Sequence, residues 1–202
     1  MTSPSPPSST SQAAPARLAV LLSGSGRTLV NLLDHIRAAK LSATIPLVIA
    51  SRECVGAQRA RSADIPLHVI PGDIPADELS RLLADYQIDL VALAGYLRLV
   101  NVPSAYRGRI VNIHPALLPA FGGKGMYGDR VHAAVIASRA KQSGCTVHVV
   151  DDVYDQGPIL LQKTCPVLPN DDPHTLAARV FGLECEAYPE ALQHLIRRGV
   201  QP

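Results

Sequence analysis

The chain has 202 residues, of which 47% are hydrophobic and 18% charged, a composition typical of one globular domain with a substantial core. Its formal net charge is +2, and its basic residues are spread along the chain, so no electrostatic surface for nucleic acid is expected. No apolar run approaches the roughly 20 residues that cross a bilayer, which argues against a membrane partner.

Residues 1–16 are rich in serine, proline and alanine. They have neither the charge near Met1 nor the apolar stretch of a signal peptide. A segment of this composition buries too little apolar surface to order itself. We therefore expect a disordered tail over residues 1–16 and a single domain over residues 17–202.

Apolar runs of strand length alternate with segments that repeat apolar residues at helical spacing. Strands are predicted over residues 17–22, 45–50, 67–70, 89–94 and 109–114, and helices over residues 29–40, 56–63 and 75–86. Thr28 is the expected N-cap of the first helix. Beyond a glycine-dense loop, a helix is predicted over 130–141, strands over 144–150 and 159–167, and a long helix over 173–197.

This order predicts βαβ units and a parallel sheet. The last two strands are joined by a short connection, so they should pair antiparallel. The expected fold is α/β: a Rossmann-like, mostly parallel twisted sheet with helices on both faces and an antiparallel C-terminal strand pair. Ligands bind beyond the carboxyl ends of parallel strands, so the loops at 23–28, 95–100 and 112–119 should converge at one edge.

The fifth predicted strand ends in Asn112-Ile113-His114-Pro115. Side chains alternate along a strand, so the Asn112 amide and the His114 imidazole share one face. Pro115 ends the strand because it has no N–H for the ladder. An amide and an imidazole at the carboxyl end of a buried strand are candidates for catalytic residues.

The turn Ser23-Gly24-Ser25-Gly26-Arg27-Thr28 joins the first strand to the first helix. Such a turn can cradle a phosphate, because glycines allow close approach and the helix start presents N–H groups. An ordinary tight turn has the same composition. As a dinucleotide fingerprint the turn is incomplete, since Leu29 takes the place of the third glycine. Arg52 could bind a 2′-phosphate, which keeps an NADP-binding alternative open.

The segment 151–158 is acidic and then turns at a Gly-Pro pair. One of its carboxylates could partner His114 and raise the pKa of the ring, whereas Asp151 and Asp152 are expected in a solvated turn. His148 is a candidate to support the site. The histidines on predicted helices or caps are expected to be bystanders: His35, His132, His174 and His194.

The four cysteines form neither a CxxC pair nor a Cys/His cluster with zinc-ligand spacing; they are Cys54, Cys145, Cys165 and Cys185. We therefore expect reduced thiols, no metal and a cytoplasmic protein.

Four segments occur in the order found in the folate-dependent formyltransferase superfamily: residues 22–29, 93–98, 112–119 and 144–158. Over residues 17–197 the chain resembles the phosphoribosylglycinamide formyltransferases of purine synthesis. The Asn-x-His-Pro and Asp-x-Gly-Pro elements are common to the superfamily. The opening Ser-Gly-x-Gly-Arg-Thr-Leu narrows the resemblance to this family.

The resemblance implies transfer of a formyl group from 10-formyltetrahydrofolate to the amine of glycinamide ribonucleotide, through a tetrahedral intermediate. Protonated His114 and the Asn112 amide would stabilise the oxyanion. His114 would also protonate the leaving folate nitrogen, and Asp155 would raise the pKa of His114.

The same resemblance implies the binding residues. Gly26, Arg27 and Thr28 would bind the substrate phosphate, and Glu184 would contact its ribose or glycinamide end. The folate site would be lined by Leu97, Arg98, Leu99, Val100 and Asn112, and the reaction needs no metal.

The chain departs from this family at two places. A folate-contacting arginine often precedes the third helix, where this chain has Pro71-Gly72-Asp73. The loop 122–128 also differs from the usual family loop, which makes Lys124 a candidate phosphate partner.

Two other activities are compatible with parts of the sequence. A 10-formyltetrahydrofolate hydrolase would use the same folate site with water as the nucleophile, although such proteins usually carry an N-terminal regulatory domain. An NADP-dependent Rossmann oxidoreductase is the less well matched alternative. In each case the expected partners are small molecules, and the sequence allows a monomer or a homodimer.

Overall fold

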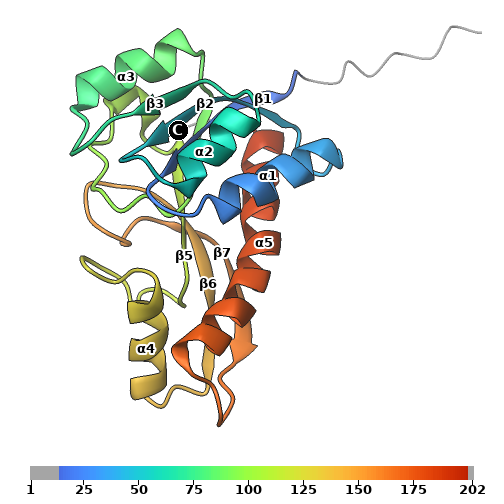
Figure 1. Ribbon diagram of the computed structural model, residues 1–202, viewed down its shortest axis with the longest axis vertical. Helices are drawn as coiled ribbons and strands as arrows, with labels where there is room; N and C mark the ends of the chain where they lie inside the picture. The colour runs from blue at the N-terminus through green and yellow to red at the C-terminus, as the bar shows by residue number, and fades with distance from the viewer. Residues whose placement is uncertain (1–13, 200–202) are drawn as a thin grey trace, which may run out of the picture.

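A computed structural model describes residues 14–199 of the chain (Figure 1). Most of the expected N-terminal tail lies outside the described residues. The first strand, β1, begins at Ala16, one residue before the predicted start of the domain. Within the described part, no helix is both long enough and apolar enough to cross a membrane.

Seven strands form one sheet in the order β3-β2-β1-β4-β5-β6-β7. Their bounds are β1 Ala16–Leu22, β2 Ala43–Ala50, β3 Leu67–Val69, β4 Leu90–Leu93, β5 Ile110–His114, β6 Gln142–Val149 and β7 Ile159–Pro166. The first five strands are parallel, β6 is antiparallel to β5, and β7 is antiparallel to β6. The predicted fold class is therefore confirmed.

Helices cover both faces of the sheet (Figure 1), and the core is divided into two hydrophobic clusters. The larger cluster includes residues of α1 Arg27–Arg37, α2 Val55–Ser62, α4 Asp129–Ala137 and α5 Pro173–Arg197. The smaller cluster includes residues of α3 Ala76–Asp85 and the 3-10 turn η1 Ser104–Tyr106.

The central strand β1 contributes to both clusters. Leu18, Val20 and Leu22 belong to the larger cluster. Ala19 and Leu21, which alternate with them, belong to the smaller. Both sides of this strand are buried, which explains its continuous apolar run.

The first helix starts earlier than predicted, because Gly26 is its N-cap and Arg27 its first residue. Gly26 has a φ of 72°, in the left-handed region that glycine adopts without steric cost. A Cβ added at this position would also lie 2.6 Å from the Gly56 Cα. The predicted Thr28 cap is therefore wrong, and Thr28 lies inside the first helical turn.

Tyr188 of α5 links the carboxyl end of β4 to the first half of β5. Its hydroxyl oxygen lies 3.0 Å from the Leu93 carbonyl oxygen and 2.8 Å from that of Val111. The side chain is fully buried, and its hydroxyl has one proton to donate. One buried hydroxyl thus links the two strands that border the site described below.

We expect Tyr188→Phe to lower the free energy of unfolding by about 1–3 kcal/mol, because buried carbonyl oxygens lose their donor. Urea unfolding measures the change. Tyr86→Phe is the matched control: the Tyr86 hydroxyl belongs to a half-buried side chain and contacts His68 at 3.2 Å, so its loss should cost about 0.5 kcal/mol or less. Equal losses in the two variants would contradict this role of Tyr188.

Candidate active site

A cavity of about 590 Å³ lies at the carboxyl ends of β1, β4 and β5. Its walls contain residues from each of the three loops that were expected to converge, at 24–28, 93–100 and 112–115. The loop before α4, the connection between β6 and β7, and one side of α5 complete the walls. The predicted convergence at one edge of the sheet is confirmed.

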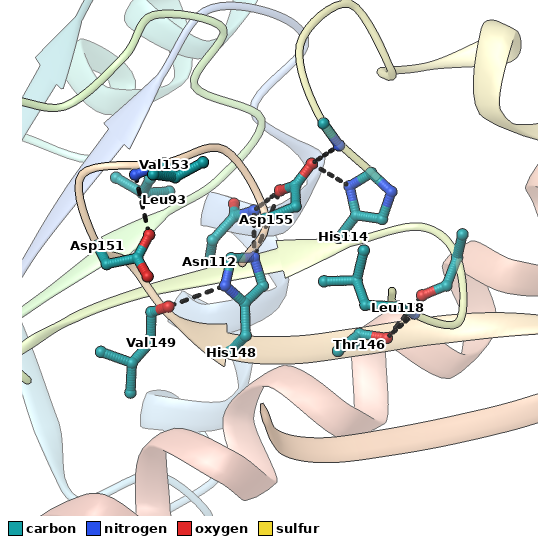
Figure 2. Close-up of polar contacts among 12 residues, drawn as sticks. Leu93, Asn112, His114, Leu118, Thr146, His148, Val149, Asp151, Val153 and Asp155 are labelled. Carbon is teal, nitrogen blue, oxygen red and sulfur yellow. Dashed lines mark hydrogen bonds and ion pairs between the residues drawn. The ribbon is translucent and has the colours of Figure 1, made fainter. Parts of the chain in front are cut away.

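Two neighbouring strands place the polar side chains of the site. β5 presents Asn112 and His114 to the cavity, because alternate residues of a strand share a face. β6 places His148 opposite Asn112 and Thr146 opposite His114. Asp155 reaches the same point from the β6–β7 connection, and Figure 2 shows its carboxylate directed toward both imidazoles and the amide.

The Asp155 carboxylate contacts the amide and both imidazoles. Its Oδ2 accepts a hydrogen bond from the Gly123 N–H at 2.9 Å and lies 3.5 Å from His114 Nδ1. Its Oδ1 lies 3.4 Å from Asn112 Nδ2 and 3.5 Å from His148 Nε2. Burial by itself raises the pKa of this carboxyl, but the His148, His114 and Gly123 contacts outweigh burial and hold the pKa below its usual range.

The two ring nitrogens of His114 have different partners. Nε2 lies 2.8 Å from the Phe121 carbonyl oxygen. A carbonyl oxygen only accepts, so Nε2 carries a proton and Nδ1 is the nitrogen that faces Asp155. Burial lowers the pKa of His114 below its ordinary value, although Asp155 and the Phe121 hydrogen bond oppose this shift. Asp155 thus acts in the predicted direction, but burial has the larger effect and the net shift is downward.

The Asn112 amide is held by its neighbours on β6. His148 Nδ1 donates to the Val149 carbonyl oxygen at 2.9 Å, and its Nε2 lies 3.1 Å from Asn112 Nδ2. The second amide hydrogen is directed to Asp155 across the longer 3.4 Å contact. His148 therefore orients Asn112.

Thr146 supports the loop that follows His114. Its hydroxyl donates to the Ala116 carbonyl oxygen at 2.7 Å and accepts from the Leu118 N–H at 3.0 Å (Figure 2). The Gln162 amide, from β7, donates to the same hydroxyl at 2.9 Å. Thr146 was not predicted, because the β5–β6 register that places it opposite His114 is not visible in a single sequence.

Gly26, Arg27 and Thr28 line the cavity at the start of α1, where the first backbone N–H groups have no partner within the helix. The Arg27 guanidinium lies 4.0 Å from the centre of the Phe181 ring, a cation–π contact. Glu184 also lines the cavity, and burial raises its pKa to about 7 while Arg27 opposes the shift. Phe181 was missed, although it lies one helical turn before Glu184.

The five residues expected to line a folate site are all in the cavity walls: Leu97, Arg98, Leu99, Val100 and Asn112. Ser23 connects the loop after β4 to the end of β1. Its hydroxyl oxygen accepts hydrogen bonds from the Leu97 N–H at 2.9 Å and the Ser51 hydroxyl at 2.7 Å. The loops after β1 and β4 are therefore held together.

Other residues from the sequence analysis are divided between the cavity and its surroundings. Lys124 is in the cavity wall, whereas Pro71-Gly72-Asp73 and Arg52 are not. Arg52 instead donates from Nε to the Ser23 carbonyl oxygen at 2.9 Å. His132, expected to be a bystander, is buried in the wall. Among residues 14–199, no group of three or more His, Cys, Asp or Glu side chains could hold a metal ion.

Comparison with known proteins identifies the family. The formyl transferase family matches residues 16–192. The chain belongs to this family. It is 43% identical over 194 residues to a chloroplastic phosphoribosylglycinamide formyltransferase from Vigna unguiculata. The match covers 91% of this chain and 62% of the relative. The chain therefore spans less than two thirds of that relative's length.

Two further members of the formyl transferase family match over most of their length. A phosphoribosylglycinamide formyltransferase from Mycobacterium tuberculosis is 37% identical over 195 residues, covering 93% of this chain and 88% of the relative. The crystal structure of glycinamide ribonucleotide transformylase 1 from Symbiobacterium toebii has a TM-score of 0.81 and 39% identity, covering 90% of this chain and 88% of that one.

We expect the pKa of His114 to lie below its ordinary value, and Asp155→Asn to lower it further, because the carboxylate is the main influence that raises it. NMR titration of the ring C–H resonance measures both values, and its loss in His114→Gln assigns it. A His114 pKa that rises or stays constant in Asp155→Asn would contradict this electrostatic description.

Proposed function

We propose that the chain transfers the formyl group of 10-formyltetrahydrofolate to the amine of glycinamide ribonucleotide, a step of purine biosynthesis. The observation that carries the proposal is the contact of Asp155 with His114 and Asn112 in the wall of a cavity that also contains the start of α1. The names of the relatives from Vigna unguiculata and Mycobacterium tuberculosis support the same activity.

We assign the phosphate of the ribonucleotide to Gly26, Arg27 and Thr28. The free N–H groups of the first helical turn and the Arg27 guanidinium supply the positive charge that a phosphate requires. Glu184 lies in the same cavity, and we assign its carboxyl to the ribose or glycinamide end of the substrate.

We assign the folate donor to the loop at Leu97, Arg98, Leu99 and Val100. Leu97 is 44% exposed although it lines the cavity, so it offers apolar surface for a ring system to cover. The cavity volume of about 590 Å³ falls within the range of roughly 300–1,000 Å³ that is usual for small-molecule sites.

The reaction forms a C–N bond between the amine and the formyl carbon and breaks the bond from that carbon to the folate nitrogen. Burial favours the neutral form of His114, in which the Nδ1 lone pair can take the proton that the amine loses. The imidazolium that forms is stabilised by Asp155, and it then gives the proton to the leaving folate nitrogen. The proton count therefore balances without another reactant.

Charge develops on the formyl oxygen in the tetrahedral intermediate. We propose that this oxygen takes the place of Asp155 as acceptor of one Asn112 N–H, because the 3.4 Å contact with Asp155 is the longer of the two that the amide makes. The contact with His148 keeps the amide in place during this change. Such a donor, fixed before the reaction, lowers the energy of the transition state.

We further propose that the chain acts in the cytoplasm, as a monomer or a homodimer, on small molecules alone. The relative from Vigna unguiculata is named as a chloroplastic protein, so the amount of this protein should be compared between the plastid and the cytoplasmic fraction. Cell fractionation measures the location, and light scattering measures the oligomeric state.

The direct test is incubation of the purified chain with 10-formyltetrahydrofolate and glycinamide ribonucleotide. We expect formylated ribonucleotide and tetrahydrofolate in equal amounts, measured by mass spectrometry. Absence of the formylated product would refute the proposal. Formate released at the same rate without the amine would indicate the hydrolase, and NADPH binding at low micromolar affinity would support the oxidoreductase.

We expect His114→Ala and Asp155→Asn each to lower kcat by about 10²–10⁴-fold, the usual contribution of general acid–base catalysis. The KM values should change little, because these groups act mainly in the transition state. Asp152→Asn is the matched control, since Asp152 is exposed and pairs with Arg107. Unaltered turnover in Asp155→Asn would rule out the assigned role.

A further inference from the structure

Buried polar atoms without a partner are uncommon in folded proteins. Among the described residues, three buried side-chain atoms have none: Arg109 Nε, His132 Nδ1 and Ser143 Oγ. Of these three residues, His132 alone lines the cavity. The position of an unsatisfied imidazole in the wall of a binding cavity calls for an explanation by function.

His132 is the fourth residue of α4, and it is only 4% exposed. Burial is the largest influence on its pKa and lowers it; the nearby Asp129 has a smaller raising effect, and His114 lowers the pKa further. Burial therefore favours the neutral ring, which has a proton on one nitrogen only.

The surroundings of the two nitrogens indicate which one carries the proton. A wholly buried N–H without an acceptor is rarer than a buried acceptor without a donor. Nδ1 is wholly buried and unpartnered, so it holds the lone pair. Nε2 then carries the proton, and it is the nitrogen that can donate a hydrogen bond into the cavity.

We propose that His132 binds the amine substrate by donating a hydrogen bond from Nε2 to an oxygen of its phosphoribosyl group. α4 packs against α5, whose Phe181 lies under Arg27. α5 also carries Glu184, which is assigned to the ribonucleotide, so we assign the hydrogen bond of His132 to the same substrate rather than to the folate donor. This inference rests on the proposed function and adds a substrate-binding residue to it.

The test compares three variants of the full chain. His132→Leu removes the donor, His132→Asn keeps an amide near the Nδ1 position, and His132→Gln places an amide near the Nε2 position. We expect the KM for glycinamide ribonucleotide to rise about 5- to 10-fold in the Leu and Asn variants, the effect of one neutral hydrogen bond. The Gln variant should recover most of the affinity.

The KM for the folate donor and kcat should change less than about twofold in all three variants, because the hydrogen bond is made to the other substrate. Thermal unfolding should show no loss of stability in His132→Leu, because an unsatisfied polar group is replaced by an apolar one. His35→Leu is the control: His35 contacts the Asn31 carbonyl oxygen on α1 at 2.9 Å, outside the cavity walls, and its loss should leave both KM values unchanged.

An unchanged ribonucleotide KM in both the Leu and Asn variants would overturn the inference, as would an equal rise for both substrates. Equal KM values in the Asn and Gln variants would also overturn it, even if the Leu variant does not fold. Calorimetry with the unmodified chain separates the two proposals. No binding of glycinamide ribonucleotide overturns both, whereas binding that the variants do not weaken overturns only the role of His132.

Discussion

The arrangement of the site depends on one buried carboxylate, that of Asp155. The residue has a φ of 57°, a left-handed conformation that costs free energy outside glycine. Its contacts with Gly123, His114, Asn112 and His148 compensate for this cost. The loop at Gly122 also passes close to Asp155, since a Cβ added at Gly122 would be 3.2 Å from the Asp155 Cβ.

The same carboxylate influences the protonation of the ring beside it. The Phe121 carbonyl fixes the proton of His114 on Nε2 and leaves Nδ1 facing Asp155. Burial disfavours the protonated ring, and the carboxylate favours it. A ring balanced between these influences can accept a proton and release it again, which is what transfer between two nitrogens requires. The antiparallel turn of the sheet at β6 makes this possible, because it brings His148 and the Asp155 loop back to β5.

Much of the fold follows from local patterns in the sequence. The apolar runs predicted the strands, and the alternation along β5 placed Asn112 and His114 on one face. The acidic segment 151–158 predicted a carboxylate partner for His114, whereas the role of Glu184 came only from the resemblance to a family. Neither Thr146 nor the position of His132 was predicted, because both depend on how distant elements pack. The net shift of the His114 pKa was missed for a related reason: the extent of burial is a property of the folded chain.

The central claim is that His114 and Asp155 act as one unit in proton transfer. A double-mutant cycle on formyl transfer, with His114→Gln, Asp155→Asn and the double variant, tests this most directly. Residues that act as a unit show non-additive effects on kcat. We predict that the double variant loses about as much turnover as the more damaged single variant. A loss equal to the product of the two single losses would contradict the account.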